Sequence, residues 1–155
     1  MNIQWKKLAI CVAIPLAVGG AAALLTRESM ETFSKLNQPP LSPPGWLFPV
    51  VWTVLYALMG IASYLVVRTE SSERSRNALT LYAVQLAFNF VWSILFFNMG
   101  AYLLALVWLA ILWVLIFCTL LAFLRIHLWA GRLIIPYLLW VSFAAYLNAG
   151  IWYLN

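Results

Sequence analysis

Charged side chains are scarce in this sequence, at 8% of its 155 residues, with four Glu and no Asp. Soluble domains carry about 25% charged and about 45–50% apolar residues, whereas this chain is 66% apolar. So few charges cannot cover a surface that faces water, and so many apolar residues exclude a disordered chain. We therefore expect an integral membrane protein.

The residues that usually carry catalysis or bind metals are equally scarce. The sequence holds two cysteines, Cys11 and Cys118, and a single histidine, His127. A disulfide scaffold, a structural metal site and a histidine-ligated haem are thereby excluded, and we expect no cofactor. The apolar runs contain no Asp, Glu, Lys or Arg, so no proton or ion relay is visible. No Ser-His-Asp arrangement or glycine-rich phosphate loop is present either.

Long uncharged runs dominate the rest of the chain, over 8–26, 36–67, 77–124 and 133–155. About 20 apolar residues span a bilayer as a helix, and Asn98-Met99-Gly100 divides the third run into two spans. A proline cluster shortens the second run. The sequence thus predicts an all-α integral membrane protein, one domain over 1–155. It is a five-transmembrane-helix bundle with helices at about 8–25, 46–67, 78–98, 101–124 and 133–154.

The positive residues predict how this bundle is oriented. Seven lie in the N-terminal tail and in the second and fourth connections: Lys6, Lys7, Arg68, Arg74, Arg76, Arg125 and Arg132. Only Arg27 and Lys35 lie in the other connections. The excess of Lys and Arg on one side predicts a multi-pass cell-membrane protein with its N-terminus cytoplasmic and its C-terminus outside. The net charge of +5 then reflects sidedness, and we expect no nucleic-acid partner.

The first apolar run has a second interpretation. Lys6-Lys7, the run itself and Ala21-Ala22-Ala23 also resemble a signal peptide with its cleavage site. The same small residues, with Gly19 and Gly20, suit close contacts between helices. We favour a retained helix.

The long first connection ends in a proline-rich segment, Asn37 to Trp46, which holds four of the seven prolines. Proline fixes φ and disfavours helix in the residue before it, so this segment is predicted to be extended and stiff. It is either a rigid spacer, with Trp46 as an interfacial anchor, or a preformed lid over the outer mouth of the bundle.

Polar and aromatic residues recur at helical spacing inside three predicted spans. On the third helix, one face carries Gln85, Asn89 and Ser93, with Trp92 and Tyr82 close by. One face of the fifth helix carries Trp140, Ala144 and Asn148, with Tyr137 and Trp152 a turn away on either side. The second helix has Trp52, Tyr56 and Gly60 on one face. Polar groups in a membrane usually face the bundle interior or a cavity. These faces predict either a ligand pocket or an interior of packed rings and interhelical hydrogen bonds.

Ala83 and Ala87 lie on the other face of the third helix, with the spacing of small residues that permits close helix packing. That face contacts either a neighbouring helix of the same bundle or a second copy of the chain. We favour a homodimer.

Three motifs resemble the tryptophan-rich sensory / translocator protein family, which includes the peripheral-type benzodiazepine receptor. They are Pro43-Pro44-Gly45-Trp46-Leu47-Phe48-Pro49-Val50-Val51-Trp52-Thr53-Val54-Leu55-Tyr56, then Gln85-Leu86-Ala87-Phe88-Asn89-Phe90-Val91-Trp92-Ser93, then Pro136-Tyr137-Leu138-Leu139-Trp140-Val141-Ser142-Phe143-Ala144-Ala145-Tyr146-Leu147-Asn148. The similarity covers essentially the whole chain and makes it resemble a bacterial member.

The resemblance implies a five-helix bundle, commonly a homodimer, that binds porphyrins and benzodiazepine or isoquinoline ligands beneath the first loop. Carried over by motif, the pocket residues are Trp52, Asn89, Trp140 and Ala144. Some bacterial members are proposed to degrade protoporphyrin in light, and Trp52 and Trp140 match the tryptophans implicated. Leu41 stands where the family often has an aromatic. The cholesterol motif is missing at Ala149 and Tyr153, so cholesterol is not an expected partner.

We therefore predict a porphyrin-binding membrane protein that acts as sensor, carrier or scavenger. The ligand, a porphyrin or another flat apolar molecule, would stack on Trp52 and Trp140 and bond Asn89, with Arg27 or Lys35 pairing its propionates. The full predicted ligand set is Trp46, Trp52, Tyr56, Gln85, Asn89, Trp92, Ser93, Trp140, Ala144 and Asn148. The alternative is a light-dependent porphyrin-degrading enzyme acting through Trp52 and Trp140. The third hypothesis is that the protein exports a small molecule.

Overall fold

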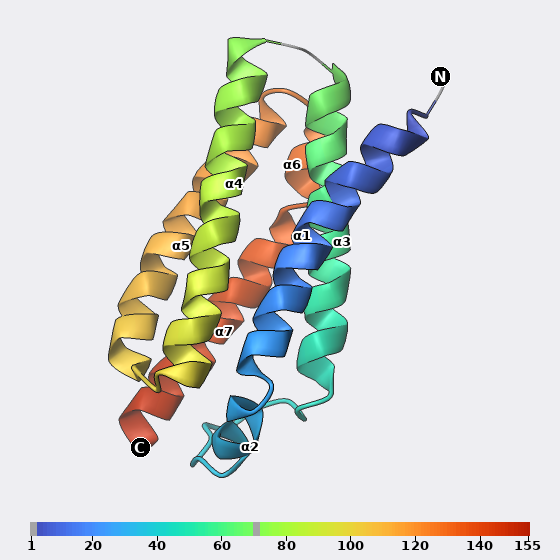
Figure 1. The fold of residues 1–155 in the computed structure, drawn as a ribbon. Coiled ribbons are helices and arrows are strands. Elements are labelled where there is room, and N and C mark those ends of the chain that lie inside the picture. Colours follow the sequence, from blue (N-terminus) through green and yellow to red (C-terminus); the bar gives the residue numbers. More distant parts are fainter. Residues whose placement is uncertain (1–2, 70–71) are drawn as a thin grey trace.

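A computed structural model describes residues 3–69 and 72–155 of the chain (Figure 1). Its elements are α1 (Trp5–Thr26), α2 (Ser29–Ser34), α3 (Leu47–Thr69), α4 (Glu73–Ser93), the π-helical turn η1 (Ile94–Asn98), α5 (Tyr102–Leu124), α6 (Leu128–Arg132) and α7 (Ile135–Leu154). No strand occurs within those two ranges. The predicted all-α class is confirmed.

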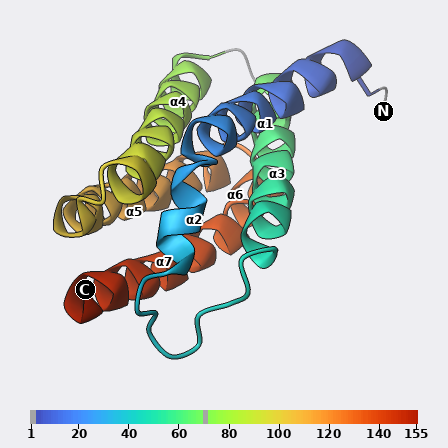
Figure 2. The same ribbon diagram turned by 60° about the horizontal axis from the view of Figure 1, so that its bottom comes forward.

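Five helical segments in the described chain are long and apolar enough to cross a membrane: Trp5–Thr26, Leu47–Thr69, Glu73–Asn98, Tyr102–Leu124 and Leu128–Leu154. They run lengthwise in one bundle, in which α1 packs on α3, α4 on α5, and α5 on α7 (Figures 1 and 2). Each span overlaps one predicted from the uncharged runs. Their number and order were therefore readable from the sequence.

The helix starts differ from the predicted ones where charged residues join the helices. α1 begins at Trp5, so Lys6 and Lys7 are helical. α4 begins at Glu73, five residues before the predicted start, because the Ser72 hydroxyl caps it by accepting the Ser75 N–H at 3.3 Å. A search for uncharged runs cannot find such a start, since the helix continues beyond the apolar region.

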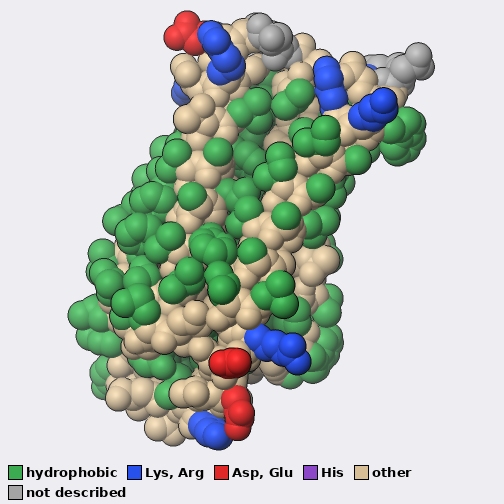
Figure 3. Space-filling model, in the orientation of Figure 1, with side chains coloured by type: hydrophobic (Ala, Val, Ile, Leu, Met, Phe, Trp, Pro, Cys, Tyr) green, Lys and Arg blue, Asp and Glu red, His purple; other side chains and the backbone are tan. Residues whose placement is uncertain are grey.

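The two ends of the bundle differ in charge. The N-terminus, the start of α4 and the α5–α6 connection lie at one end, and α2 and the C-terminus lie at the other (Figure 1). Figure 3 shows blue Lys and Arg side chains at both ends of this face, with red acidic side chains beside them at both ends. Seven Lys and Arg residues belong to the segments at the N-terminal end, whereas Arg27 and Lys35 lie near α2. The segments grouped by charge in the sequence therefore do share one end.

The first connection is more structured than predicted, because it contains α2 and then a tight turn. The Ser42 N–H donates to the Pro39 carbonyl at 3.3 Å, and Leu41 has a φ of 68°. The segment is thus extended only on either side of this turn, and the prediction of a continuously extended segment was wrong there.

The connection is also attached to α7. Asn155 Nδ2 donates to the Asn37 carbonyl at 2.9 Å and Asn155 Oδ1 accepts the Asn37 N–H at 3.0 Å. The Tyr146 hydroxyl donates to the Pro40 carbonyl at 2.7 Å. Gly150 has no side chain where the Pro39 ring packs. These contacts hold the loop across the end of the bundle (Figure 2).

Candidate ligand site

A cavity of about 340 Å³ opens at the α2 end of the bundle, between α1, α3 and the α4–η1 junction. Its lining combines small residues, aromatic rings and few polar groups: Gly19, Ala22, Ala23, Thr26, Arg27, Met30, Gly45, Phe48, Pro49, Trp52, Tyr56, Trp92, Ser93 and Phe97. Apolar pockets of roughly 300–1,000 Å³ with a few oriented polar groups are typical small-molecule sites. This cavity is therefore the candidate ligand site.

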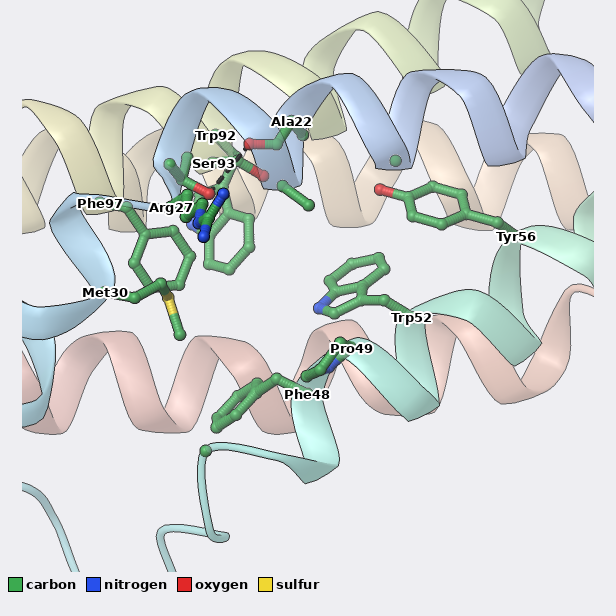
Figure 4. Close-up of a pocket in the computed structure, with 14 residues that line it drawn as sticks. Ala22, Arg27, Met30, Phe48, Pro49, Trp52, Tyr56, Trp92, Ser93 and Phe97 are labelled. Atoms are coloured by element: carbon green, nitrogen blue, oxygen red, sulfur yellow. Dashed lines mark hydrogen bonds between the residues drawn. The ribbon is translucent and has the colours of Figure 1, made fainter.

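Aromatic rings form two of its walls. On α3, Trp52 stacks on Tyr56 with ring centroids 5.4 Å apart and 29° between the planes. Opposite them, Trp92 and Phe97 come from α4 and η1, and the Trp52 and Trp92 centroids lie 6.3 Å apart. The Trp52 indole nitrogen faces the cavity (Figure 4). A flat apolar ligand would meet ring faces and one N–H donor here.

The remaining wall comes from α1, and its residues leave space. Gly19, Ala22, Ala23 and Thr26 have the i, i+3, i+4, i+7 spacing of one helical face. A side chain at Gly19 would overlap the Tyr56 ring. From the sequence, Gly19, Ala22 and Ala23 are interpreted as helix contacts or as part of a signal-peptide cleavage region, although their spacing with Thr26 could have identified a cavity wall.

Arg27 supplies the positive charge of the cavity. Arg27 lines the cavity together with Trp92, Ser93 and Phe97 (Figure 4). Within residues 3–69 and 72–155 the sole ion pair joins Lys35 to Glu31 at 3.3 Å, on the surface. Of the two cations predicted to meet a ligand carboxylate, Arg27 is thus the one that lines the cavity, and it has no carboxylate partner among the described residues.

Asn148 holds Trp92 in place without reaching the cavity. Its Oδ1 accepts the Trp92 indole N–H at 3.2 Å, and its Nδ2 donates to the Tyr102 carbonyl at 2.8 Å. The Asn148 side chain is fully buried. This predicted site residue therefore acts on the cavity through Trp92.

Gln85 and Asn89 lie deeper, where they join α4 to α7. Asn89 Nδ2 donates to the Tyr137 hydroxyl at 2.8 Å, and that hydroxyl donates to Gln85 Oε1 at 2.9 Å. All three side chains are buried, and none lines the cavity. Of the two interpretations of their spacing, a ligand pocket or interhelical hydrogen bonds, the structure shows these amides in interhelical hydrogen bonds. Asn89 Oδ1 is left without a partner in the described chain.

Trp140 and Ala144 lie on α7 outside the lining. The Phe48 ring lines the cavity and meets Trp140 edge to face at 5.9 Å, so Trp140 stands behind Phe48. Its indole nitrogen is buried with no partner among the described residues. Trp46 is 67% exposed in the turn before α3. The structure therefore brings together Trp52, Tyr56, Trp92 and Ser93 of the predicted set, but not Trp46, Trp140 or Ala144.

The described residues contain no group of three or more His, Cys, Asp or Glu side chains able to hold a metal ion. The cavity offers ring faces, one indole N–H and a guanidinium. Such a set can bind a flat anionic aromatic molecule, and it lacks a general base.

Comparisons with known proteins agree with this architecture. Residues 11–154 match the model of the TspO/MBR family. The tryptophan-rich protein TspO of Chlorobaculum tepidum is 43% identical, over 100% of this chain and 99% of that protein. The tryptophan-rich sensory protein of Cereibacter sphaeroides is 38% identical over 96% and 90%. The translocator protein of Bos taurus is 36% identical over 98% and 92%.

Proposed function

We propose that this chain, which belongs to the TspO/MBR family as its motifs predicted, binds a porphyrin-type tetrapyrrole in the cavity beside Trp52. It is a multi-pass membrane protein, and we place its N-terminus in the cytoplasm from the Lys and Arg count. Two relatives are named a sensory protein and a translocator protein. Sensing, carrying or scavenging the bound molecule is accordingly the role we propose.

The observation that carries this proposal is the contact between the Trp52 and Trp92 rings in the lining of the cavity. Offset or tilted aromatic pairs are most favourable with centroids about 4.5–7 Å apart. The two rings are already 6.3 Å apart, so a macrocycle would lie against one of them or displace it rather than fit between them. Arg27 would pair a propionate at the mouth, since guanidinium–carboxylate pairs are strong where water is partly excluded.

The test is a titration of purified protein with protoporphyrin, followed by quenching of intrinsic tryptophan fluorescence. We expect Trp52→Ala to weaken binding by about tenfold or more, the equivalent of about 1.4 kcal/mol. Trp5→Ala is the matched control, because Trp5 is 70% exposed at the opposite end of the bundle. Equal affinity in wild type, Trp52→Ala and Trp5→Ala would remove this site assignment.

The same titration is also carried out with a Trp140 variant, whose affinity is compared with that of the Trp52 variant. Because Phe48 separates Trp140 from the cavity, Trp140→Ala is expected to affect binding less than Trp52→Ala. A larger effect at Trp140 would mean that Phe48 moves aside and that the ligand sits nearer α7, as the family resemblance implies.

A light-dependent porphyrin-degrading enzyme is the second candidate, favoured by the rings around Trp52. Its ring contacts Tyr56, Trp92 and Tyr137 at centroid distances of 5.4–6.3 Å. Trp52 would donate one electron to the photoexcited porphyrin, and the reduced porphyrin would pass that electron to dioxygen to give superoxide. The Trp52 radical cation would then take one electron from the porphyrin, and the porphyrin radical cation would combine with superoxide, so that the porphyrin is oxidised and Trp52 is restored. This candidate requires light- and oxygen-dependent loss of porphyrin absorbance over several turnovers. Equal bleaching with Trp52→Phe/Trp140→Phe would make the protein a bystander.

A further inference from the structure

A second hollow lies at the N-terminal end of the bundle, between α4 and α5. It is a cleft of about 210 Å³ lined by Arg74, Asn77, Ala78, Leu81, Ala122 and Arg125. It shares no residue with the ligand cavity, which opens at the α2 end. Whatever this cleft binds is therefore separate from the proposed porphyrin.

Two arginines from different parts of the bundle line the cleft. Arg74 lies in the first turn of α4, and Arg125 directly follows the last residue of α5. Both are exposed, and neither forms an ion pair within the part of the chain that the structure describes. Neighbouring like charges repel, so an anion bound between them would stabilise both.

Helix stability does not explain the placement of Arg74. A cation near a helix N-terminus is unfavourable, because the free N–H groups there already carry partial positive charge. Both those N–H groups and Arg74 would instead attract an anion. Sorting of positive residues to one side of a membrane explains the sign of the charge at this end. It does not explain why Arg74, Asn77 and Arg125 line one cleft.

The floor of the cleft is apolar. Arg74, Asn77, Ala78 and Leu81 follow one face of α4, with the polar pair nearer the helix end and the apolar pair one turn deeper. Ala122 lies one turn deeper than Arg125 on α5. A polar mouth above an apolar floor matches a molecule with a charged head and a hydrocarbon chain better than a free ion.

We propose that this cleft binds an anionic phospholipid, with Arg74 and Arg125 on the headgroup phosphate and an acyl chain along Ala78, Leu81 and Ala122. Arginine suits this role, since its planar N–H donors match phosphate oxygens and it stays charged. Basic pockets between transmembrane helices are recognised sites for anionic headgroups. Asn77 would donate its amide N–H to the same headgroup.

The experiment measures retained lipid by native mass spectrometry of the full chain, titrated in detergent with phosphatidylglycerol or with inorganic phosphate. We expect Arg74→Gln/Arg125→Gln to lower the affinity for phosphatidylglycerol by about tenfold or more, as the loss of two charge-assisted contacts implies. Arg76→Gln/Arg132→Gln removes the same charge at the same end, but neither residue lines the cleft, so this variant should bind as the wild type does.

A third variant tests the apolar floor. Ala122→Leu fills it and leaves both arginines, so it should weaken binding of phosphatidylglycerol. Equal affinity of the two double variants for phosphatidylglycerol would overturn the site and leave only general surface electrostatics. Inorganic phosphate that binds through Arg74 and Arg125, together with phosphatidylglycerol binding unchanged in Ala122→Leu, would overturn the lipid as occupant. Thermal unfolding in lipid-free detergent checks that each variant is folded.

Discussion

The Tyr137 hydroxyl connects two buried amide side chains in the interior of the bundle. It accepts from Asn89 at 2.8 Å and donates to Gln85 at 2.9 Å, so one oxygen on α7 forms a hydrogen bond with each of two amides on α4. Its ring also meets Trp52 edge to face at 6.1 Å. The polar interior and the ligand cavity are thus in contact through Tyr137, although the amides do not line the cavity.

We predict that Tyr137→Phe destabilises the protein by about 1–2 kcal/mol, because it leaves a buried amide donor and acceptor unpaired. The measurement is thermal unfolding in detergent. Tyr153→Phe is the control, since Tyr153 is 84% exposed and its hydroxyl has no hydrogen-bond partner in the described chain. Equal unfolding temperatures for the two variants would contradict a stabilising role for the Tyr137 hydroxyl.

How far the sequence predicts such details depends on the residue. The spacing of Gln85, Asn89 and Ser93 correctly places them on one face of α4. Periodicity within a single helix cannot say whether that face meets a cavity or another helix's polar group. Gln85 and Asn89 face another helix because they form hydrogen bonds with Tyr137, which lies about 50 residues further along the chain. Only Ser93, one turn nearer the α2 end, reaches the cavity.

The packing of α1 on α3 also involves a contact that the residue spacing within one helix does not identify. Gly60 meets the α1 backbone so closely that an added Cβ would lie 2.5 Å from Val12 Cα and 2.8 Å from the Cys11 carbonyl oxygen. Backbone atoms cannot move aside as the end of a flexible side chain can. The sequence places Gly60 on one helix face with Trp52 and Tyr56, and the structure packs the α1 backbone against Gly60.

We predict that Gly60→Ala separates α1 from α3 and destabilises the protein by about 1–3 kcal/mol, the usual cost of overpacking. Gly20→Ala is the matched control on α1, because a Cβ there meets nothing within 4 Å. That substitution should stabilise the helix by about 0.5–1 kcal/mol. Unfolding midpoints of both variants in one detergent give the comparison, and shifts of the same sign would contradict it.

The first connection is the element that the sequence predicted least well. Proline content correctly indicated a non-helical segment before α3, but nothing in Asn37 to Trp46 identifies its partners on α7. Those partners are Tyr146 and Asn155, more than 100 residues away. α2 was not predicted either, because six residues are too few for a periodic pattern to appear.

We predict that Asn155→Ala loosens this connection without unfolding the bundle, since it removes both hydrogen bonds to Asn37. Amide hydrogen exchange in 37–46 should rise, while exchange within α5 stays unchanged. Asn77→Ala is a control for the loss of an exposed asparagine at the other end. Unaltered exchange in 37–46 would show that Tyr146 and Pro39 hold the loop without Asn155.

At the scale of the whole molecule, one long face of the bundle carries a groove built from small residues. The groove lies between α1 and α4 and is lined by Ala17, Val18, Ala21, Ala83, Leu86, Ala87, Phe90 and Val91. Ala83 and Ala87 are exposed on it, so α1 packs beside these alanines without covering them. The ligand cavity is on the other side of α1, lined by Gly19, Ala22 and Ala23.

We propose that a second copy of the chain packs on this groove and forms a symmetric homodimer. No hydrophobic driving force acts between helices in lipid, so close packing of small residues supplies the association. A twofold axis brings the same groove of both copies together.

Ala83→Leu/Ala87→Leu should therefore yield monomers in bilayer crosslinking, with protoporphyrin binding unchanged because the cavity lies apart. Ala110→Leu, at an exposed position on α5 outside the groove, should dimerise as the wild type does. Dimers that persist in the double variant would contradict this interface, and joint loss of folding and binding would instead place both alanines in contacts within the bundle.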